Sequence, residues 1–89
     1  MTKHFNITVS GKVQGVMFRK YCQEKALQLR LTGFVQNIPN GTVWIEAEGP
    51  VQALNQLVIW CQDGSPRSEV RSVKYAIGEV QGYTEFEVK

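Results

Sequence analysis

Residues Gln14 to Arg19 have the composition of an anion-binding loop. Gly15 allows a sharp backbone turn, and the residues after it begin a predicted helix, whose first amide N–H groups have no intrahelical partners. Such amides bind phosphate oxygens, and Arg19 adds a permanently charged fork of hydrogen-bond donors. On spacing alone, an ordinary strand-to-helix turn with a solvated Arg19 is the commoner explanation.

A second polar residue, Asn37, lies near the end of the largely apolar segment Phe34 to Ile38. A carboxamide there can stabilise the following turn, or it can orient a water molecule for attack on a bound ligand. Taken alone, the residue leaves both alternatives open.

Other catalytic chemistries lack their residues. The one histidine, His4, is expected to be exposed at the start of a strand rather than catalytic. A cysteine phosphatase needs its thiolate within the loop before the arginine, whereas Cys22 follows Arg19. No Cys/His zinc pattern and no carboxylate cluster for two metals is apparent. The residues therefore predict chemistry without a metal or a cofactor.

The elements that must position these residues alternate between strand and helix periodicity. Alternating apolar residues predict strands near residues 5–10, 34–38, 42–48 and 71–77, with a short closing strand within 83–88. Helical spacing predicts helices over residues 18–30 and from residue 50 to about 63. The βαββαβ order indicates an α+β, ferredoxin-like sandwich. Its two helices should cover one face of an antiparallel sheet of four to five strands.

Turn residues and topology refine this prediction. Gly33 suits a left-handed cap after the first helix, and Asn40-Gly41 between two strands predicts a tight hairpin with two positive φ angles. The helical crossover makes the first two strands parallel, so their carboxyl ends share one rim. Because ligands bind beyond such strand ends, Arg19 and Asn37 should lie in one neighbourhood.

The composition sets the class of protein. Hydrophobic residues make up 43%, charged residues 20%, and the net charge is +2, which predicts one globular domain over residues 1–89. The weak charge predicts no nucleic-acid partner, and the lack of a long apolar run predicts no membrane partner and no signal peptide. We expect a cytoplasmic monomer with reduced thiols, although a bridge between Cys22 and Cys61 remains open.

Three segments resemble the acylphosphatase family. Residues 11–19 fit the family pattern G-x-V-Q-G-V-x-F-R throughout. Residues 33–49 fit G-[aromatic]-[small apolar]-x-N-x-x-x-G-x-V-x5-G, and residues 83–88 resemble the closing Y-x-x-F-x-[aliphatic]. Gln36 stands at a position that is often basic in the family, which implies a modest change in local charge.

The resemblance implies hydrolysis of small acyl phosphates to a carboxylate and inorganic phosphate, without a metal or a covalent intermediate. It makes Arg19 the phosphate-binding arginine and Asn37 the residue that positions the attacking water. The remaining phosphate ligands would be the loop amides of Gly15, Val16, Met17 and Phe18. A non-catalytic anion-binding module is the alternative. RNA binding on the open sheet face would need stacked aromatic residues, where the first strand offers Asn6 and Thr8.

Overall fold

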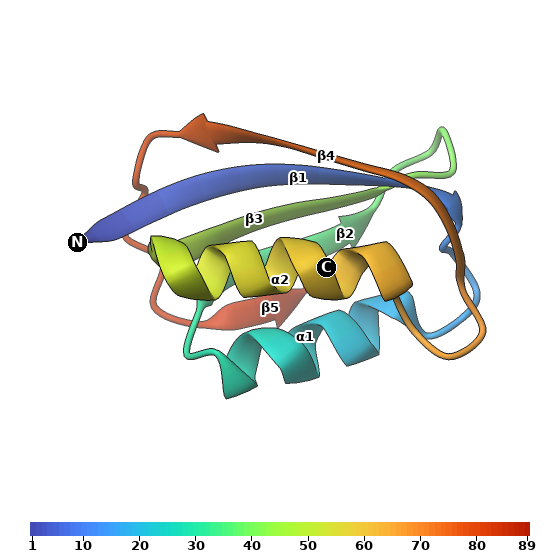
Figure 1. Cartoon of the computed structure of the whole chain (residues 1–89), viewed down its shortest axis with the longest axis horizontal. Helices are drawn as coiled ribbons and strands as arrows, with labels where there is room; N and C mark the ends of the chain where they lie inside the picture. The colour runs from blue at the N-terminus through green and yellow to red at the C-terminus, as the bar shows by residue number, and fades with distance from the viewer.

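The computed structural model describes residues 1–89 and confirms the ferredoxin-like βαββαβ order, followed by a short fifth strand (Figure 1). The elements are β1 (Thr2–Lys12), α1 (Phe18–Gln28), β2 (Thr32–Asn37), β3 (Val43–Pro50), α2 (Val51–Asp63), β4 (Glu69–Gly78) and β5 (Phe86–Val88). Both helices lie on the same side of the sheet (Figure 1). Neither helix is long and apolar enough to cross a bilayer.

The sheet has the strand order β4-β1-β3-β2-β5. The first four strands pair antiparallel, but β5 pairs parallel to β2, so the sheet is mixed rather than purely antiparallel. The reason is the route of the chain. After β4 the chain turns back at the end of the sheet, and β5 therefore runs opposite to β4 and along β2. Because β1 and β2 are both antiparallel to β3, they end at the same rim, as the topology predicts.

The core lies between the sheet and the two helices. Alternating residues of β1 and β3 are buried on the helix side, together with the inner stripes of α1 and α2. Phe18, fully buried at the start of α1, packs against Trp60 of α2 with ring centroids 5.2 Å apart. This contact fixes the first turn of α1, which follows the loop of residues 13–17. Val51, the first residue of α2, is exposed.

Gly33 does not cap the first helix. Helix α1 ends at Gln28, and the left-handed residue after it is Arg30, with φ 59°. Gly33 lies within β2 with φ 138°, and a Cβ atom there would approach the backbone oxygen of Glu46 to 1.8 Å. The close pairing of β2 with β3 therefore requires this glycine.

The hairpin between β2 and β3 also differs from the prediction. Gly41 has φ 94°, but Asn40 does not have a positive φ. Asn40 acts through its side chain, whose Oδ1 accepts hydrogen bonds from the backbone N–H of Thr42 at 3.0 Å and from its hydroxyl at 2.7 Å. The Asn-Gly pair does make the hairpin, by a different turn geometry.

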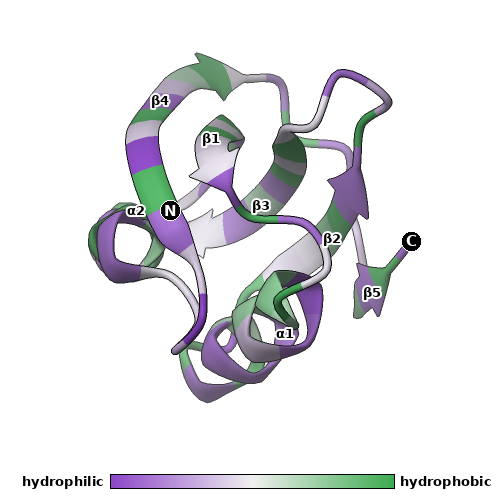
Figure 2. Cartoon of the chain, turned by 90° about the vertical axis from the view of Figure 1, so that its right-hand side faces the viewer, coloured by the Kyte–Doolittle hydropathy of each residue, from purple (hydrophilic) through white to green (hydrophobic).

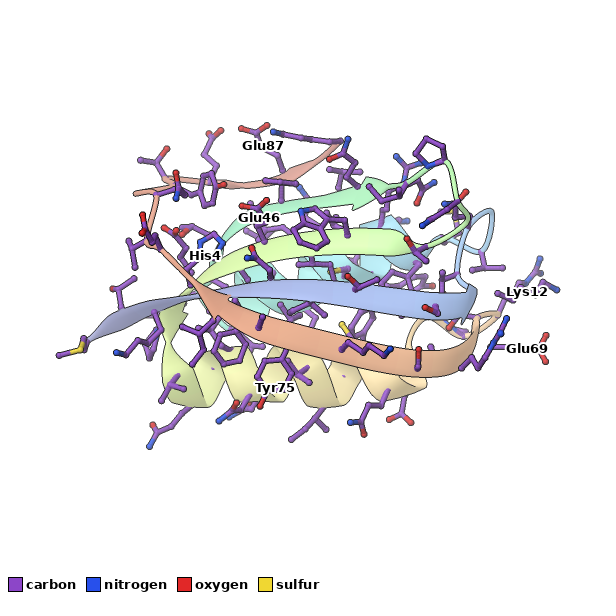
Figure 3. The ribbon with its side chains drawn as sticks, turned by 90° about the horizontal axis from the view of Figure 1, so that it is seen from above. His4, Lys12, Glu46, Glu69, Tyr75 and Glu87 are labelled. Carbon is purple, nitrogen blue, oxygen red and sulfur yellow. The ribbon has the colours of Figure 1, made fainter.

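His4 is buried, with 2% of its surface exposed, so the prediction of an exposed histidine was wrong. Its Nδ1 lies 2.6 Å from a carboxylate oxygen of Glu48, and its Nε2 lies 2.8 Å from Oδ1 of Asn6. Glu48 also accepts hydrogen bonds from the N–H groups of residues 81–83. The cluster thus attaches the segment before β5 to the open face of the sheet, where Figure 3 shows His4 beside Glu46.

Candidate active site

The rim where β1 and β2 end collects three connections of the chain. They are residues 13–17 between β1 and α1, residues 38–42 between β2 and β3, and residues 64–68 between α2 and β4. All three lie at the same end of the molecule in Figure 1, and Figure 2 looks onto that end. The topology therefore brings together segments that are far apart in the sequence.

A cavity of about 280 Å³ opens at this rim. Its lining residues come from the first connection, the start of α1 and the ends of β2 and β5: Val13, Gly15, Met17, Phe18, Arg19, Lys20, Asn37 and Val88. Arg19 and Asn37 thus share one cavity. The lining carries two cationic side chains and no carboxylate, which favours an anionic ligand.

The backbone of the first connection has a conformation that can bind anions. Gly15 and Met17 both have left-handed conformations, with φ 74° and 63°. Successive amides in such turns can form a concave group of N–H donors. Met17 is the N-cap residue of α1, and no side chain caps the helix and no acidic residue stands in its first turn. The positive end of the helix dipole is therefore left for a ligand.

Ser65 fixes the orientation of the peptide between Val16 and Met17. Its hydroxyl, on a residue only 2% exposed, donates a 2.8 Å hydrogen bond to the carbonyl oxygen of Val16. In a trans peptide the carbonyl and the N–H point in opposite directions. The N–H of Met17, in the same peptide, therefore points away from Ser65.

Arg19 is held by the last residue of the chain. Its Nη1 donates a 2.7 Å hydrogen bond to the backbone oxygen of Lys89, whose own N–H donates to the carbonyl of Val35 at 2.8 Å. The side chain is half-buried. A guanidinium has five N–H donors, so this contact orients Arg19 and leaves other donors for a ligand.

Asn37 is positioned by strand pairing. It is the last residue of β2 and pairs with Val43 of β3, which in turn pairs with Val9 of β1. Paired residues share a face of the sheet, and both valines are buried beneath the helices. The Asn37 side chain therefore lies on the helix side, at the rim where α1 begins.

Gln14 connects the two halves of the site. Its side-chain Nε2 donates hydrogen bonds to the carbonyl oxygens of Ile38, at 2.8 Å, and Thr42, at 2.9 Å. The loop of residues 13–17 is thereby attached to the hairpin that follows Asn37.

Both thiols are free and buried. Burial raises the pKa of Cys22 well above its usual value and raises the pKa of Cys61 to about 12. Both side chains are therefore neutral thiols near pH 7. No group of three or more His, Cys, Asp or Glu side chains is arranged to hold a metal ion.

Comparison with known proteins identifies the family. The family model described as acylphosphatase matches residues 5–88. This chain belongs to the acylphosphatase family. An acylphosphatase of Synechococcus sp. (strain WH7803) is 39% identical over 88 residues, covering 99% of this chain and 88% of the relative. The resemblance of the three sequence motifs is therefore confirmed.

Solved acylphosphatases share the fold. The structure from Coxiella burnetii superposes with a TM-score of 0.96 at 38% identity, covering 99% of this chain and 93% of that chain. The structure from Bacillus subtilis superposes with a TM-score of 0.95 at 37% identity, covering 100% and 99%. Family, sequence and fold together support acylphosphatase activity, and hence a hydrolase.

Five of the predicted site residues line this cavity and Val16 does not, and the motifs did not identify the contacts that support the cavity. Arg19, Asn37 and the loop glycine line it together. The roles of Ser65 and of the Lys89 carbonyl were missed, and Gln14 was noticed only as a motif position. Nothing local marks Ser65, whose acceptor lies 49 residues away. The only sequence signal for Gln14 was its place in the family motif, directly before Gly15.

Proposed function

We propose that this acylphosphatase binds the phosphate of its substrate with the loop amides of residues 15–18 and with Arg19, and that Asn37 orients the attacking water. The observation that carries the proposal is the shared cavity, in which Arg19, Asn37 and the start of α1 meet. The ligand is a small acyl phosphate, whose dianionic end matches a lining with cations and no carboxylate.

Phosphate binding follows from the loop geometry. Left-handed turns at Gly15 and Met17, with Ser65 holding the Val16 carbonyl on the far side, favour N–H groups that point toward the cavity. The guanidinium of Arg19, oriented by the Lys89 carbonyl, can donate a pair of parallel hydrogen bonds to two phosphoryl oxygens. These donors are in place before the substrate arrives, so they stabilise the charge that develops on the phosphoryl oxygens in the transition state.

The reaction needs little acid or base catalysis. The leaving carboxylate has a conjugate acid of pKa about 4, so it departs with the bonding electron pair and needs no proton at neutral pH. Water forms the new bond to phosphorus as the bond to the acyl oxygen breaks. A phosphoryl oxygen of the substrate accepts the proton of the water. Positioning and charge stabilisation then supply most of the rate acceleration, without a metal ion.

Asn37 is suited to orient this water. A carboxamide offers one acceptor oxygen and an NH₂ donor, which can hold a water molecule without taking its proton. Its place at the end of β2 puts it on a different element from the phosphate-binding groups, across the cavity they share.

The test is a turnover assay with benzoyl phosphate, run with and without a chelator. We expect hydrolysis in both conditions. Asn37→Ala should lower kcat strongly while inorganic phosphate still inhibits competitively with an unchanged constant. Phosphate binding without turnover by the wild-type protein would instead identify an anion-binding module. Full activity of Asn37→Ala would refute the role in water positioning.

We further propose that residues 1–89 form one domain that works as a cytoplasmic monomer without nucleic-acid partners. The two free, buried thiols suit a reducing compartment. The small net charge of +2 argues against a nucleic-acid partner. Analytical ultracentrifugation of the purified protein tests the monomer, and a sedimenting dimer would contradict it.

A further inference from the structure

Gln14 joins the proposed phosphate loop to the hairpin that directly follows Asn37. Its Nε2 donates to the carbonyl oxygens of Ile38, at 2.8 Å, and Thr42, at 2.9 Å. Gln14 directly precedes Gly15 of the loop, and Ile38 directly follows Asn37. The side chain therefore spans the two halves of the proposed site, which are 24 residues apart along the chain.

The hairpin does not need Gln14 to close. The N–H of Ile38 donates to the Thr42 carbonyl at 2.9 Å, and the N–H of Gly41 donates to the Ile38 carbonyl at 3.0 Å. Both carbonyl oxygens that Gln14 reaches are thus already acceptors within the turn. Gln14 adds an external attachment, which determines where the turn lies relative to the loop.

The phosphate-binding groups do not need Gln14 to keep their own geometry either. Residues 15–19 are continuous in sequence, and they are held separately by Ser65, by the buried Phe18 ring and by the Lys89 carbonyl. Asn37 is the one proposed participant that comes from a separate element, the strand β2. Strand pairing holds the backbone of Asn37 in the sheet, and the Gln14 contact decides how the end of β2 lies against the loop.

The proposed phosphate ligands, the amides of residues 15–18 and the Arg19 side chain, are called the phosphate cradle below. We propose that Gln14 is a positioning residue, which sets the distance between this cradle and the Asn37 carboxamide. This inference rests on the proposed roles of Arg19 and Asn37. Without the two hydrogen bonds of Gln14, the hairpin shifts relative to the loop, and the water is no longer in line with the bond that breaks. A displacement of about 1 Å can slow a reaction roughly 100-fold.

Gln14→Met tests this with a side chain of similar size that has no donor. We expect kcat for benzoyl phosphate to fall roughly 10- to 100-fold. The competitive inhibition constant of inorganic phosphate should stay within about threefold, since the cradle is intact. An equal change in both constants would mean that Gln14 supports the cradle itself and would overturn the proposal.

Gln23→Met is the matched control. The Gln23 side chain, also half-buried, donates one 2.9 Å hydrogen bond to the carbonyl of Phe86 and so links α1 to β5, away from Asn37. The same chemical change there should leave kcat within about threefold of wild type. Gln14→Glu retains the size of the side chain and replaces the donor with acceptors, so kcat should fall at least as far as in Gln14→Met. Wild-type kcat in either Gln14 variant would overturn the proposal.

A double-mutant cycle separates positioning from general support. If Gln14 acts through Asn37, then Asn37→Ala combined with Gln14→Met is no slower than Asn37→Ala alone. Multiplied losses would show an independent effect and refute the inference. Wild-type kcat in Asn37→Ala would refute the proposed water role and this inference together. A slow Asn37→Ala with a fast Gln14→Met would refute only the positioning by Gln14.

Discussion

Arg19→Ala should abolish most of the activity, because the guanidinium supplies the only planar fork of donors in the cavity. One Nη1 hydrogen bond goes to Lys89, so two further hydrogen bonds can reach the phosphoryl oxygens. Each hydrogen bond to a charged partner contributes about 1.5–3 kcal/mol. Their combined loss, about 3–6 kcal/mol, corresponds to a decrease in kcat/KM of roughly 10²- to 10⁴-fold.

Arg19→Lys separates charge from geometry. Lysine retains the positive charge but not the fork, so about one of the two hydrogen bonds is lost, and kcat/KM should fall by roughly 10- to 150-fold. Lys20→Ala, which removes the neighbouring cation of the same cavity, serves as the control and should cost only a few-fold, since it lacks the fork.

The assay follows benzoyl phosphate hydrolysis together with inhibition by inorganic phosphate. Urea unfolding of each variant checks that the lost contact to Lys89 has not released β5. If Arg19→Ala were inhibited by phosphate as strongly as wild type, Arg19 would not be the phosphate ligand. If Lys20→Ala lost as much as Arg19→Ala, bulk positive charge rather than the fork would explain binding.

Four further variants test one support of the site and two contacts of the fold. Ser65→Ala should weaken phosphate inhibition several-fold and lower the free energy of unfolding by about 1–3 kcal/mol, because the buried Val16 carbonyl loses its partner; unchanged inhibition would contradict this. Gly33→Ala should lower the free energy of unfolding by about 3 kcal/mol, measured in urea. Gly41→Ala, where the added Cβ meets open space, should lower it less. Equal decreases in the two variants would contradict the steric argument. For His4, burial lowers the pKa but the hydrogen bonds to neighbouring side chains outweigh burial and raise it above 6.5. Wild type should therefore have a higher free energy of unfolding than His4→Asn. This difference should be fully present below pH 6.5 and should decrease as the pH rises through the raised pKa of His4 in the folded protein. A difference that stays constant from acidic to alkaline pH would refute the linkage.

The fold was predictable where local periodicity and tertiary burial agree. Phe5, Ile7 and Val9 alternate in the sequence and are all buried on the helix side of β1. Predictions failed where a contact distant in sequence decides the conformation. The sequence predicts an exposed His4, but its hydrogen bond to Glu48, 44 residues away, lies in a buried cluster. The sequence predicts that Gly33 caps a helix, but the position needs a glycine because the backbone of β3 comes too close for a Cβ atom.

The parallel direction of β5, which the prediction of an antiparallel sheet missed, has a similar cause. Its three residues carry too little pattern to show whether a partner strand runs parallel or antiparallel. Residues 79–85 connect β4 to β5 at the end of the sheet, and hydrogen bonds to the Glu48 carboxylate hold them there. This connection decides the direction of β5. It also brings Val88 and the Lys89 carbonyl to the cavity, beside Arg19.

The sequence by itself determined which groups we propose for the chemistry of this protein: a guanidinium, a carboxamide and the amides of a glycine turn. Those properties belong to residue types and to short-range geometry, which a linear motif contains. Tertiary structure alone decided how the groups are held, through Gln14 on the hairpin, Ser65 behind the loop and the last backbone oxygen on Arg19. The acceptors of these three contacts are backbone oxygens, which every residue has, so no side-chain pattern marks them before the chain has folded.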